Sequence, residues 1–225
     1  MKMMWQLLQA YFFPCLYCGS LQGTKALLCE RCARQLEYYE HEQGLFHYNE
    51  APYPIFALYE WNPGQSDLLS STVLALKQGQ RREAWNHYAQ KFSQKRMALN
   101  MTPSKKIRFV PAPSSSGHKD HAFAHAEALA KHFSGEVVPC LKKLKKKSQR
   151  GGNRQQRQRL RLGLDEKYSE VSKDSTDTLW VFVDDILTTG STAHAAYEVL
   201  GSPTHFEVWV LGRRSLSCGA SRYLL

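Results

Sequence analysis

The sequence predicts an α/β protein in which a parallel sheet is flanked by helices and a small four-cysteine module precedes it. Three observations carry this prediction: strand-like apolar runs alternate with helical patterns, one apolar run ends in two aspartates and a Thr/Gly loop, and four cysteines near the N-terminus form two pairs. With 225 residues and 43% hydrophobic content, the chain can bury one sizeable core and a small appended module.

Residues 1–50 are expected to contain a helix, a four-cysteine zinc ribbon and an aromatic, acidic connector. Apolar side chains at positions 4, 7, 8 and 11 have helical spacing. The stretch is too often interrupted by Gln, Pro and Gly to span a membrane, and it lacks a signal-peptide cleavage site. We therefore expect a cytoplasmic protein without membrane insertion.

The metal-binding prediction rests on two Cys-x2-Cys pairs separated by ten residues, Cys15 and Cys18 followed by Cys29 and Cys32. Each pair can aim two thiolates at one point, and four thiolates make the tetrahedral shell that structural Zn²⁺ prefers. Gly19 permits the turn that such a pair requires. Two disulfides, which a reducing cytosol disfavours, and an iron-sulfur cluster are the alternatives. Cys140 and Cys218 are expected to be ordinary buried thiols.

Residues 51–225 are expected to form the main domain, with a basic loop at residues 141–161. The strand-like runs are residues 55–59, 107–110, 137–138, 179–183 and 206–211, and the helical patterns are residues 68–76, 81–99, 122–133 and 191–200. Because strands and helices alternate, the sheet should be parallel and covered on both faces.

The most informative segment follows the apolar strand at residues 179–183. Asp184 and Asp185 stand at its carboxyl end, where open parallel sheets bind ligands. Hydroxyls, a glycine and a helix start follow, which together suit a phosphate group, at Thr188, Thr189, Gly190, Ser191 and Thr192. The two carboxylates can hold ribose hydroxyls directly or through Mg²⁺. The alternative is an acidic strand end that merely caps a helix.

At these residues the chain resembles the type I phosphoribosyltransferases, whose phosphoribosyl pyrophosphate (PRPP) motif is a strand, two acids and a Thr-Thr-Gly-Ser/Thr loop. With the four cysteines, Leu76-Lys77-Gln78-Gly79, Val110-Pro111-Ala112-Pro113 and Lys147-Ser148-Gln149, nearly the whole chain is similar to the ComF/GntX competence-protein family. The resemblance implies a type I phosphoribosyltransferase-like domain in a cytoplasmic bacterial protein of DNA uptake, with PRPP and Mg²⁺ as ligands and a partner in the uptake machinery.

The chain departs from this family beside the phosphate loop. Where family members carry Arg-Gly-Phe-Asn-Gln, it reads His121-Ala122-Phe123-Ala124-His125, and Gln156 and Leu160 replace a usual Glu and Asn in the basic stretch. The phosphate loop is intact, so PRPP binding is better supported than turnover. We interpret the histidines at positions 118, 121 and 125 as surface residues near an anionic ligand, not as metal ligands.

The formal net charge of +10 is concentrated in residues 141–161, which contain ten basic residues and no acid. Three roles remain open for this segment: contacts to nucleic-acid phosphates, a clamp over pyrophosphate, and a solvated loop. The candidate contact residues are Lys145, Lys146, Lys147, Arg154 and Arg157.

These observations favour a competence-type protein that binds PRPP and single-stranded DNA during DNA uptake or processing. One alternative is an active phosphoribosyltransferase in nucleobase or nucleotide salvage, and another is a non-catalytic DNA-binding adaptor. No motif in the sequence identifies an acceptor base.

Overall fold

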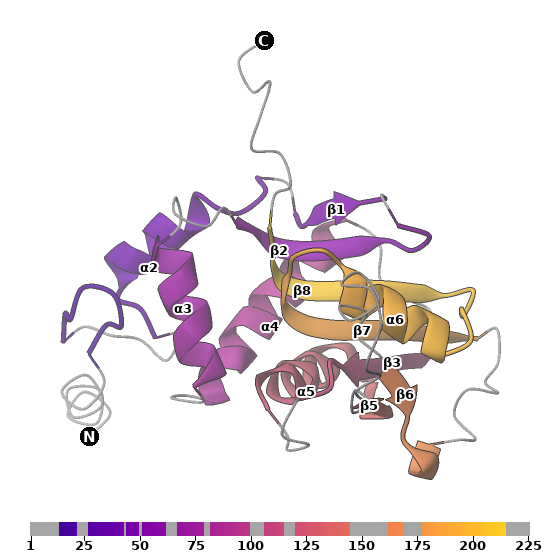
Figure 1. Ribbon diagram of the computed structural model, residues 1–225. Helices are drawn as coiled ribbons and strands as arrows, with labels where there is room; N and C mark the ends of the chain where they lie inside the picture. The colour runs from indigo at the N-terminus through magenta and orange to yellow at the C-terminus, as the bar shows by residue number, and fades with distance from the viewer. Residues whose placement is uncertain are drawn as a thin grey trace, which may run out of the picture.

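The computed structural model contains a six-stranded sheet in the order β1-β2-β8-β7-β3-β4 (Figure 1). It describes residues 14–21, 27–42, 44–49, 51–61, 67–78, 82–99, 106–114, 120–144, 162–168 and 177–214. The strands of this sheet are β1 (Phe46–Tyr48), β2 (Ile55–Trp61), β3 (Lys106–Pro111), β4 (Glu136–Val137), β7 (Thr178–Leu187) and β8 (Phe206–Arg214). All neighbouring strands are parallel except β1, which pairs antiparallel with β2.

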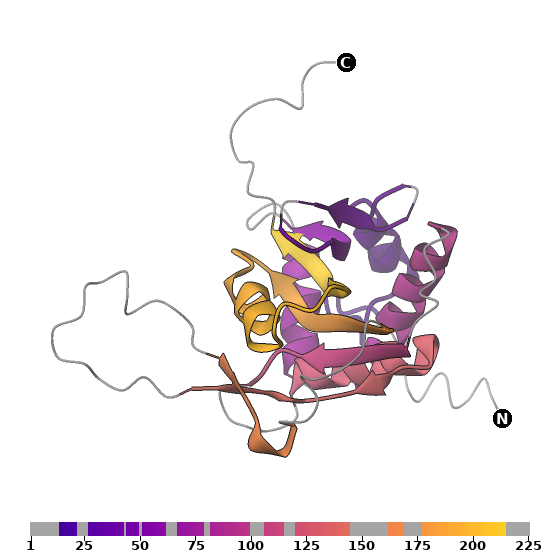
Figure 2. The same cartoon turned by 90° about the vertical axis from the view of Figure 1, so that its right-hand side faces the viewer.

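Helices cover both faces of the sheet, as Figure 2 shows from the side. The helices are α2 (Glu30–Glu37), α3 (Asp67–Lys77), α4 (Arg82–Ala98), α5 (His121–Phe133) and α6 (Ser191–Val199). On one face, α2 to α5 contribute to a core with Phe109, Val181 and Trp209. On the other face, α6 contributes to a second core with Phe182 and Val210. The α/β class and the mostly parallel, helix-flanked sheet are therefore confirmed.

Two strands leave the main sheet and form a hairpin, β5 (Leu141–Lys143) with β6 (Leu162–Leu164). The hairpin packs its apolar side chains Leu141 and Leu162 into the core beneath α6, and a short 3₁₀ turn, η2 (Glu166–Tyr168), follows it. The sequence patterns did not predict this hairpin, because three residues per strand are too few to show a period.

The predicted connector after the cysteines contains structure of its own. Helix α2 occupies residues 30–37, and β1 adds an edge strand to the main sheet at residues 46–48, on the N-terminal side of the predicted boundary at residue 50. Cys15, Cys29 and Leu36 belong to the same buried cluster as Phe56 of β2. The cysteine module and the sheet therefore share one core.

Among the predicted elements, the strand before the phosphate loop differs most. It continues through both aspartates to Leu187, because the backbone of β7 stays paired with β8 as far as Arg213. Helix α6 begins at Ser191, as predicted. The predicted N-terminal helix and all five candidate contact residues of the basic loop lie outside the described residues. Within the described part of the chain, no helix is both long and apolar enough to cross a bilayer.

Candidate functional site

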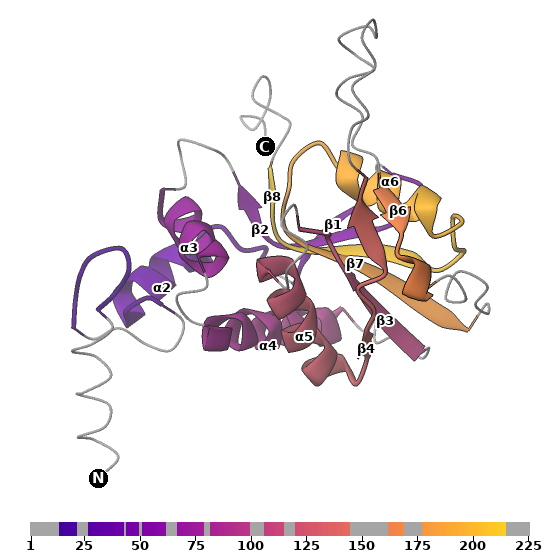
Figure 3. The same cartoon turned by 60° about the horizontal axis from the view of Figure 1, so that its bottom comes forward.

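Three elements converge on the second aspartate of β7. Asp185 is only 5% exposed, and its carboxylate lies between Lys77 at the end of α3 and His121 at the start of α5. Lys77 Nζ is 2.6 Å from Asp185 Oδ2, and His121 Nε2 is 3.6 Å from Asp185 Oδ1. Figure 3 shows the first turn of α5 beside the end of β7. The carboxyl end of the sheet therefore carries a buried acid with two basic neighbours.

The two aspartates are electrostatically unlike. Burial and the neighbouring Asp185 charge raise the pKa of Asp184 well above its ordinary value. Burial also acts to raise the pKa of Asp185, but the hydrogen bond with Asp184 and the Lys77 ammonium outweigh it, so that the net pKa is lowered. The backbone N–H of Asp185 donates to Asp184 Oδ1 at 2.9 Å. Asp185 is therefore the preferred site of the negative charge.

His125 holds the backbone beneath this pair. Its Nδ1 lies 3.2 Å from the Asp184 carbonyl oxygen, so Nδ1 carries the proton and donates to that oxygen. The ring stacks on Trp85 of α4 with centroids 4.7 Å apart. Burial lowers the pKa of His125 to about 4, against smaller opposing contributions from Asp184 and Asp185. The imidazole is therefore neutral at physiological pH, and it ties α4 and α5 to β7.

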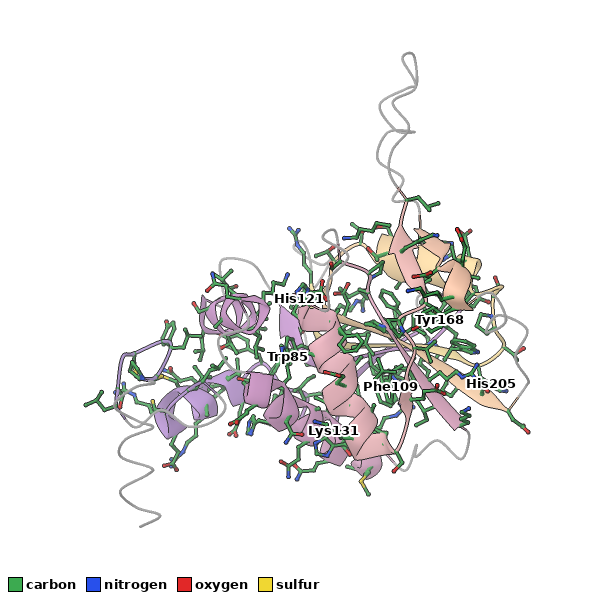
Figure 4. The ribbon with its side chains drawn as sticks, turned by 90° about the horizontal axis from the view of Figure 1, so that it is seen from below. Trp85, Phe109, His121, Lys131, Tyr168 and His205 are labelled. Atoms are coloured by element: carbon green, nitrogen blue, oxygen red, sulfur yellow. The ribbon has the colours of Figure 1, made fainter. Side chains whose placement is uncertain are left out.

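The prediction of surface histidines is wrong for His125, which is 1% exposed. His121 is partly buried, and Figure 4 shows it at the start of α5, at the other end of the helix from Lys131. The ligand atoms of His121, Asp184 and Asp185 lie within 4.8 Å of one another. Along the chain, Asp120 is the carboxylate beside these histidines, whereas the two carboxylates that reach His121 in the fold come from the distant strand β7.

The phosphate loop leads directly from β7 into α6. Gly190 has φ +71°, and a Cβ there would meet no atom within 4 Å. The hydroxyls of Thr189 and Ser191 are 3.0 Å apart, and both residues are exposed, as is Thr188. The left-handed backbone at Gly190 and the exposed hydroxyls at the helix start leave room for an anion. Thr192 is partly buried in the first turn of α6.

The four predicted metal-ligating cysteines converge. The Sγ atoms of Cys15, Cys18, Cys29 and Cys32 lie within 4.8 Å of one another, and Cys18 Sγ is 3.6 Å from Cys29 Sγ. Four thiolates bound to Zn²⁺ at about 2.3 Å would be spaced about 3.8 Å apart, so the arrangement fits a closed tetrahedral shell. The turn at Gly19 has φ +70°, whereas the second pair opens α2 instead of forming a second turn.

The thiols of this cluster have opposite tendencies. Burial acts to raise the pKa of Cys15, but backbone hydrogen bonds involving Cys18 and Cys29 lower it to about 6. Burial and hydrogen bonds with the other three thiols raise the pKa of Cys32. A divalent cation would favour the thiolate form at all four positions. Cys140, predicted to be an inert thiol, is fully buried, and burial raises its pKa to about 12.

The hairpin β5–β6 holds the two ends of the basic segment together, since Lys143 pairs with Leu162. Residues 141–161 contain no acid, but Lys142 Nζ lies 3.6 Å from the Glu166 carboxylate in η2. Both side chains are exposed, so this ion pair contributes little to stability. Glu166 lies after residue 161, and therefore outside the segment that contains ten basic residues and no acid.

Comparison with known proteins adds no assignment: no family model matches the chain, and no curated protein matches it. The site is therefore defined by its own geometry. Lys77 was not predicted to be a site residue, although it belongs to the segment Leu76-Lys77-Gln78-Gly79 that carries part of the family resemblance. Its position directly after the helical pattern at residues 68–76 gives no indication of the aspartate it contacts.

Proposed function

We propose that the carboxyl end of the sheet binds PRPP or a closely related phosphorylated ribose, and that the protein acts in competence-type DNA uptake or processing. The observation that supports this most is the continuity of β7, the loop at residues 188–190 and α6: two acids and an anion-accepting helix start share one edge of the sheet. In this proposal, the fold of the main domain, residues 51–225, is of the type I phosphoribosyltransferase-like kind.

In this proposal the side chains have separate roles. Asp184 and Asp185 accept hydrogen bonds from the ribose hydroxyls, and the backbone and hydroxyls from Thr188 to Thr192 hold the 5′-phosphate. His125 keeps the Asp184 backbone in position through its Nδ1–H. Mg²⁺ bound together with PRPP would supply positive charge to the pyrophosphate. Lys77 neutralises Asp185 before ligand arrives.

Calorimetry with PRPP and Mg²⁺ tests the binding step. We expect binding in the micromolar to millimolar range, and we expect Asp185→Asn to weaken it by about tenfold or more because a charged acceptor is lost. Asp177→Asn is the matched control, since Asp177 is exposed at the opposite end of β7. Absence of binding at millimolar PRPP would refute the proposal.

The transferase alternative predicts a further step, transfer of the ribosyl group to a base with release of pyrophosphate. Pyrophosphate release measured across nucleobases separates an active salvage enzyme from a PRPP-binding protein without turnover. If the protein is instead a DNA-binding adaptor that keeps the site only for regulation or structure, no pyrophosphate is released with any base.

The DNA part of the proposal rests on charge segregation. Residues 141–161 contain ten Lys and Arg residues and no acid. The pairing of β5 with β6 brings the two ends of this segment together. Phosphate contacts from such a loop would bind single-stranded DNA with little dependence on base sequence. In the same proposal, the protein is cytoplasmic, a structural Zn²⁺ occupies the cysteine cluster, and a protein of the DNA-uptake machinery is its partner.

A further inference from the structure

We propose that His121, Asp184 and Asp185 form a second metal site, which directly coordinates a divalent transition-metal cation of the Mn²⁺ type without PRPP. This inference does not rest on the proposed function. In the PRPP proposal Mg²⁺ arrives with the ligand's oxygens, whereas here the protein itself supplies one nitrogen and two carboxylate ligands. An imidazole nitrogen favours transition-metal cations over Mg²⁺, and two carboxylates suit Mn²⁺.

The separation of the donor atoms fits a cation of this size. Bonds of about 2.1 Å place neighbouring ligands about 3.0 Å apart and opposite ligands about 4.2 Å apart in an octahedral shell. His121 Nε2 and Asp185 Oδ1 are 3.6 Å apart, and all three donors lie within 4.8 Å of one another. His121 Nε2 and Asp185 Oδ1 would therefore have to approach by about 0.6 Å, and no other pair of donors by more than about 1.8 Å, to bind one ion.

The imidazole is also oriented as in known metal sites. Its Nε2 points toward the carboxylate of Asp185, while Nδ1 faces Asp120 Oδ2 at 4.0 Å. A metal-ligating histidine typically directs its second ring nitrogen to a carboxylate, which fixes the ring and strengthens the ligand. Asp120 is itself fixed as the N-cap of α5, because its Oδ1 accepts from the Ala122 N–H at 3.1 Å. The position of Asp120 behind His121 therefore supports a metal site independently of the two aspartates of β7.

The carboxylates are held in place before any ion arrives. Asp185 is 5% exposed on a paired strand, and His125 anchors the Asp184 carbonyl from beneath. Preorganised ligands lose less conformational entropy on binding than ligands on a loose loop.

Lys77 is an internal competitor for this site. Its ammonium contacts Asp185 Oδ2 at 2.6 Å and must leave that oxygen, or share the carboxylate, when a cation binds. The Lys77 side chain is 41% exposed, so solvent is accessible to the displaced ammonium. The proposal therefore predicts effects of opposite sign at two neighbours of Asp185: removal of His121 weakens metal binding, and removal of the Lys77 charge strengthens it.

Manganese is the appropriate probe because Mn²⁺ prefers oxygen and nitrogen ligands to thiolates and will not compete strongly for the cysteine cluster. The full-length protein, supplied with zinc, is titrated with MnCl₂ in the absence of PRPP. Electron paramagnetic resonance of free Mn²⁺ gives the stoichiometry and affinity, and pulsed measurements detect ¹⁴N coupling from a ligating imidazole. We expect one site per chain with ¹⁴N coupling.

The variants identify the ligands. His121→Ala should abolish the ¹⁴N coupling and weaken binding by about tenfold or more, and Lys77→Met should tighten binding several-fold. Asp120→Asn retains a side chain that can cap α5, and should weaken binding by about tenfold through loss of the carboxylate behind His121. His194→Ala is the matched control, because His194 lies on α6 and pairs with Glu198 instead. Circular dichroism and melting temperatures confirm that each variant is folded.

Three results would each overturn the proposal: no Mn²⁺ binding up to 1 mM in the parent protein, binding without ¹⁴N coupling, or binding and coupling that persist unchanged in His121→Ala. A failure here accompanied by PRPP binding in calorimetry would leave the proposed function intact. Conversely, nitrogen-coupled Mn²⁺ binding with no affinity for PRPP would support this site alone.

Discussion

His125 gives the protein a specific acid sensitivity. The ring is 1% exposed, stacks on Trp85 and donates from Nδ1 to the Asp184 carbonyl oxygen. Burial lowers the pKa of His125 from 6.5 to about 4. Because burial disfavours the charged imidazolium more than the nearby Asp184 and Asp185 favour it, the unfolded chain binds this proton more readily than the folded chain does. The stability contributed by His125 is fully present above pH 6.5 and is lost as the pH falls toward 4.

The magnitude follows from the same pKa values. One pKa unit corresponds to about 1.4 kcal/mol, so the difference between 6.5 and about 4 limits the effect to roughly 3 kcal/mol below pH 4. At pH 5 the unfolded form is almost fully protonated, whereas the folded form is mostly neutral. The free energy of unfolding should therefore be about 2 kcal/mol lower at pH 5 than at pH 7.5 on account of this residue.

Urea unfolding of the parent protein and of His125→Gln isolates this effect. Gln can still donate a hydrogen bond but does not titrate, so the pH dependence of the difference between the two proteins belongs to His125. Asp184 and the other acids contribute to both proteins and largely cancel. The unfolding is followed by circular dichroism between pH 7.5 and 5, with zinc present and no other divalent cation added. A difference that stays constant over this range would refute the reasoning, as would an NMR titration showing an ordinary pKa for His125.

Three further predictions concern other parts of the molecule. Metal analysis should find about one zinc per chain, and Cys32→Ser should lose that zinc and lower the melting temperature; a metal-free preparation that melts like the parent would contradict this. Gly135→Ala would place a Cβ 2.5 Å from Phe109 Cε2, and chemical denaturation should show a loss of about 1–3 kcal/mol; an unchanged midpoint would mean that the Phe109 ring can move aside. The logarithm of the single-stranded DNA affinity should fall with the logarithm of the salt concentration, with a slope of about 0.7 per neutralised phosphate. The test variant replaces five basic residues by Gln, namely Lys145, Lys146, Lys147, Arg154 and Arg157. A slope that is unchanged in this variant would exclude the basic loop as the DNA site.

Most of the sheet and its helices could be predicted from the sequence because their periods extend over enough residues. The helical pattern at residues 81–99 corresponds to α4 with only small changes at its ends, and the apolar run at residues 179–183 lies within the longer β7. The three-residue strands β1 and β5 were not predicted, although the two-residue β4 overlaps the predicted run at residues 137–138. Such short strands form because a neighbouring strand is available to pair with them, and that neighbour is not visible in the local sequence.

The candidate site was predictable only where its residues are adjacent in the chain. Asp184, Asp185 and the loop after them form one continuous segment, so their order alone indicates an anion site. His121, His125 and Lys77 reach the same place from α5 and α3, and their contacts exist only in the folded chain. Reasoning from spacing along the chain therefore separated the histidines from the acids.

The neighbours of Asp185 explain how the chain can bury a charged pair without a bound ligand. An isolated buried carboxylate is costly, but the Lys77 ammonium lies against Asp185, and the raised pKa of Asp184 reduces the charge on the other acid. Asp185→Asn would leave Lys77 without this partner, yet the lysine side chain is 41% exposed and can be hydrated instead. The variant should therefore lose cation and ribose contacts while remaining folded. This separation of binding from stability makes Asp185 the residue at which both proposals can be tested without unfolding the protein.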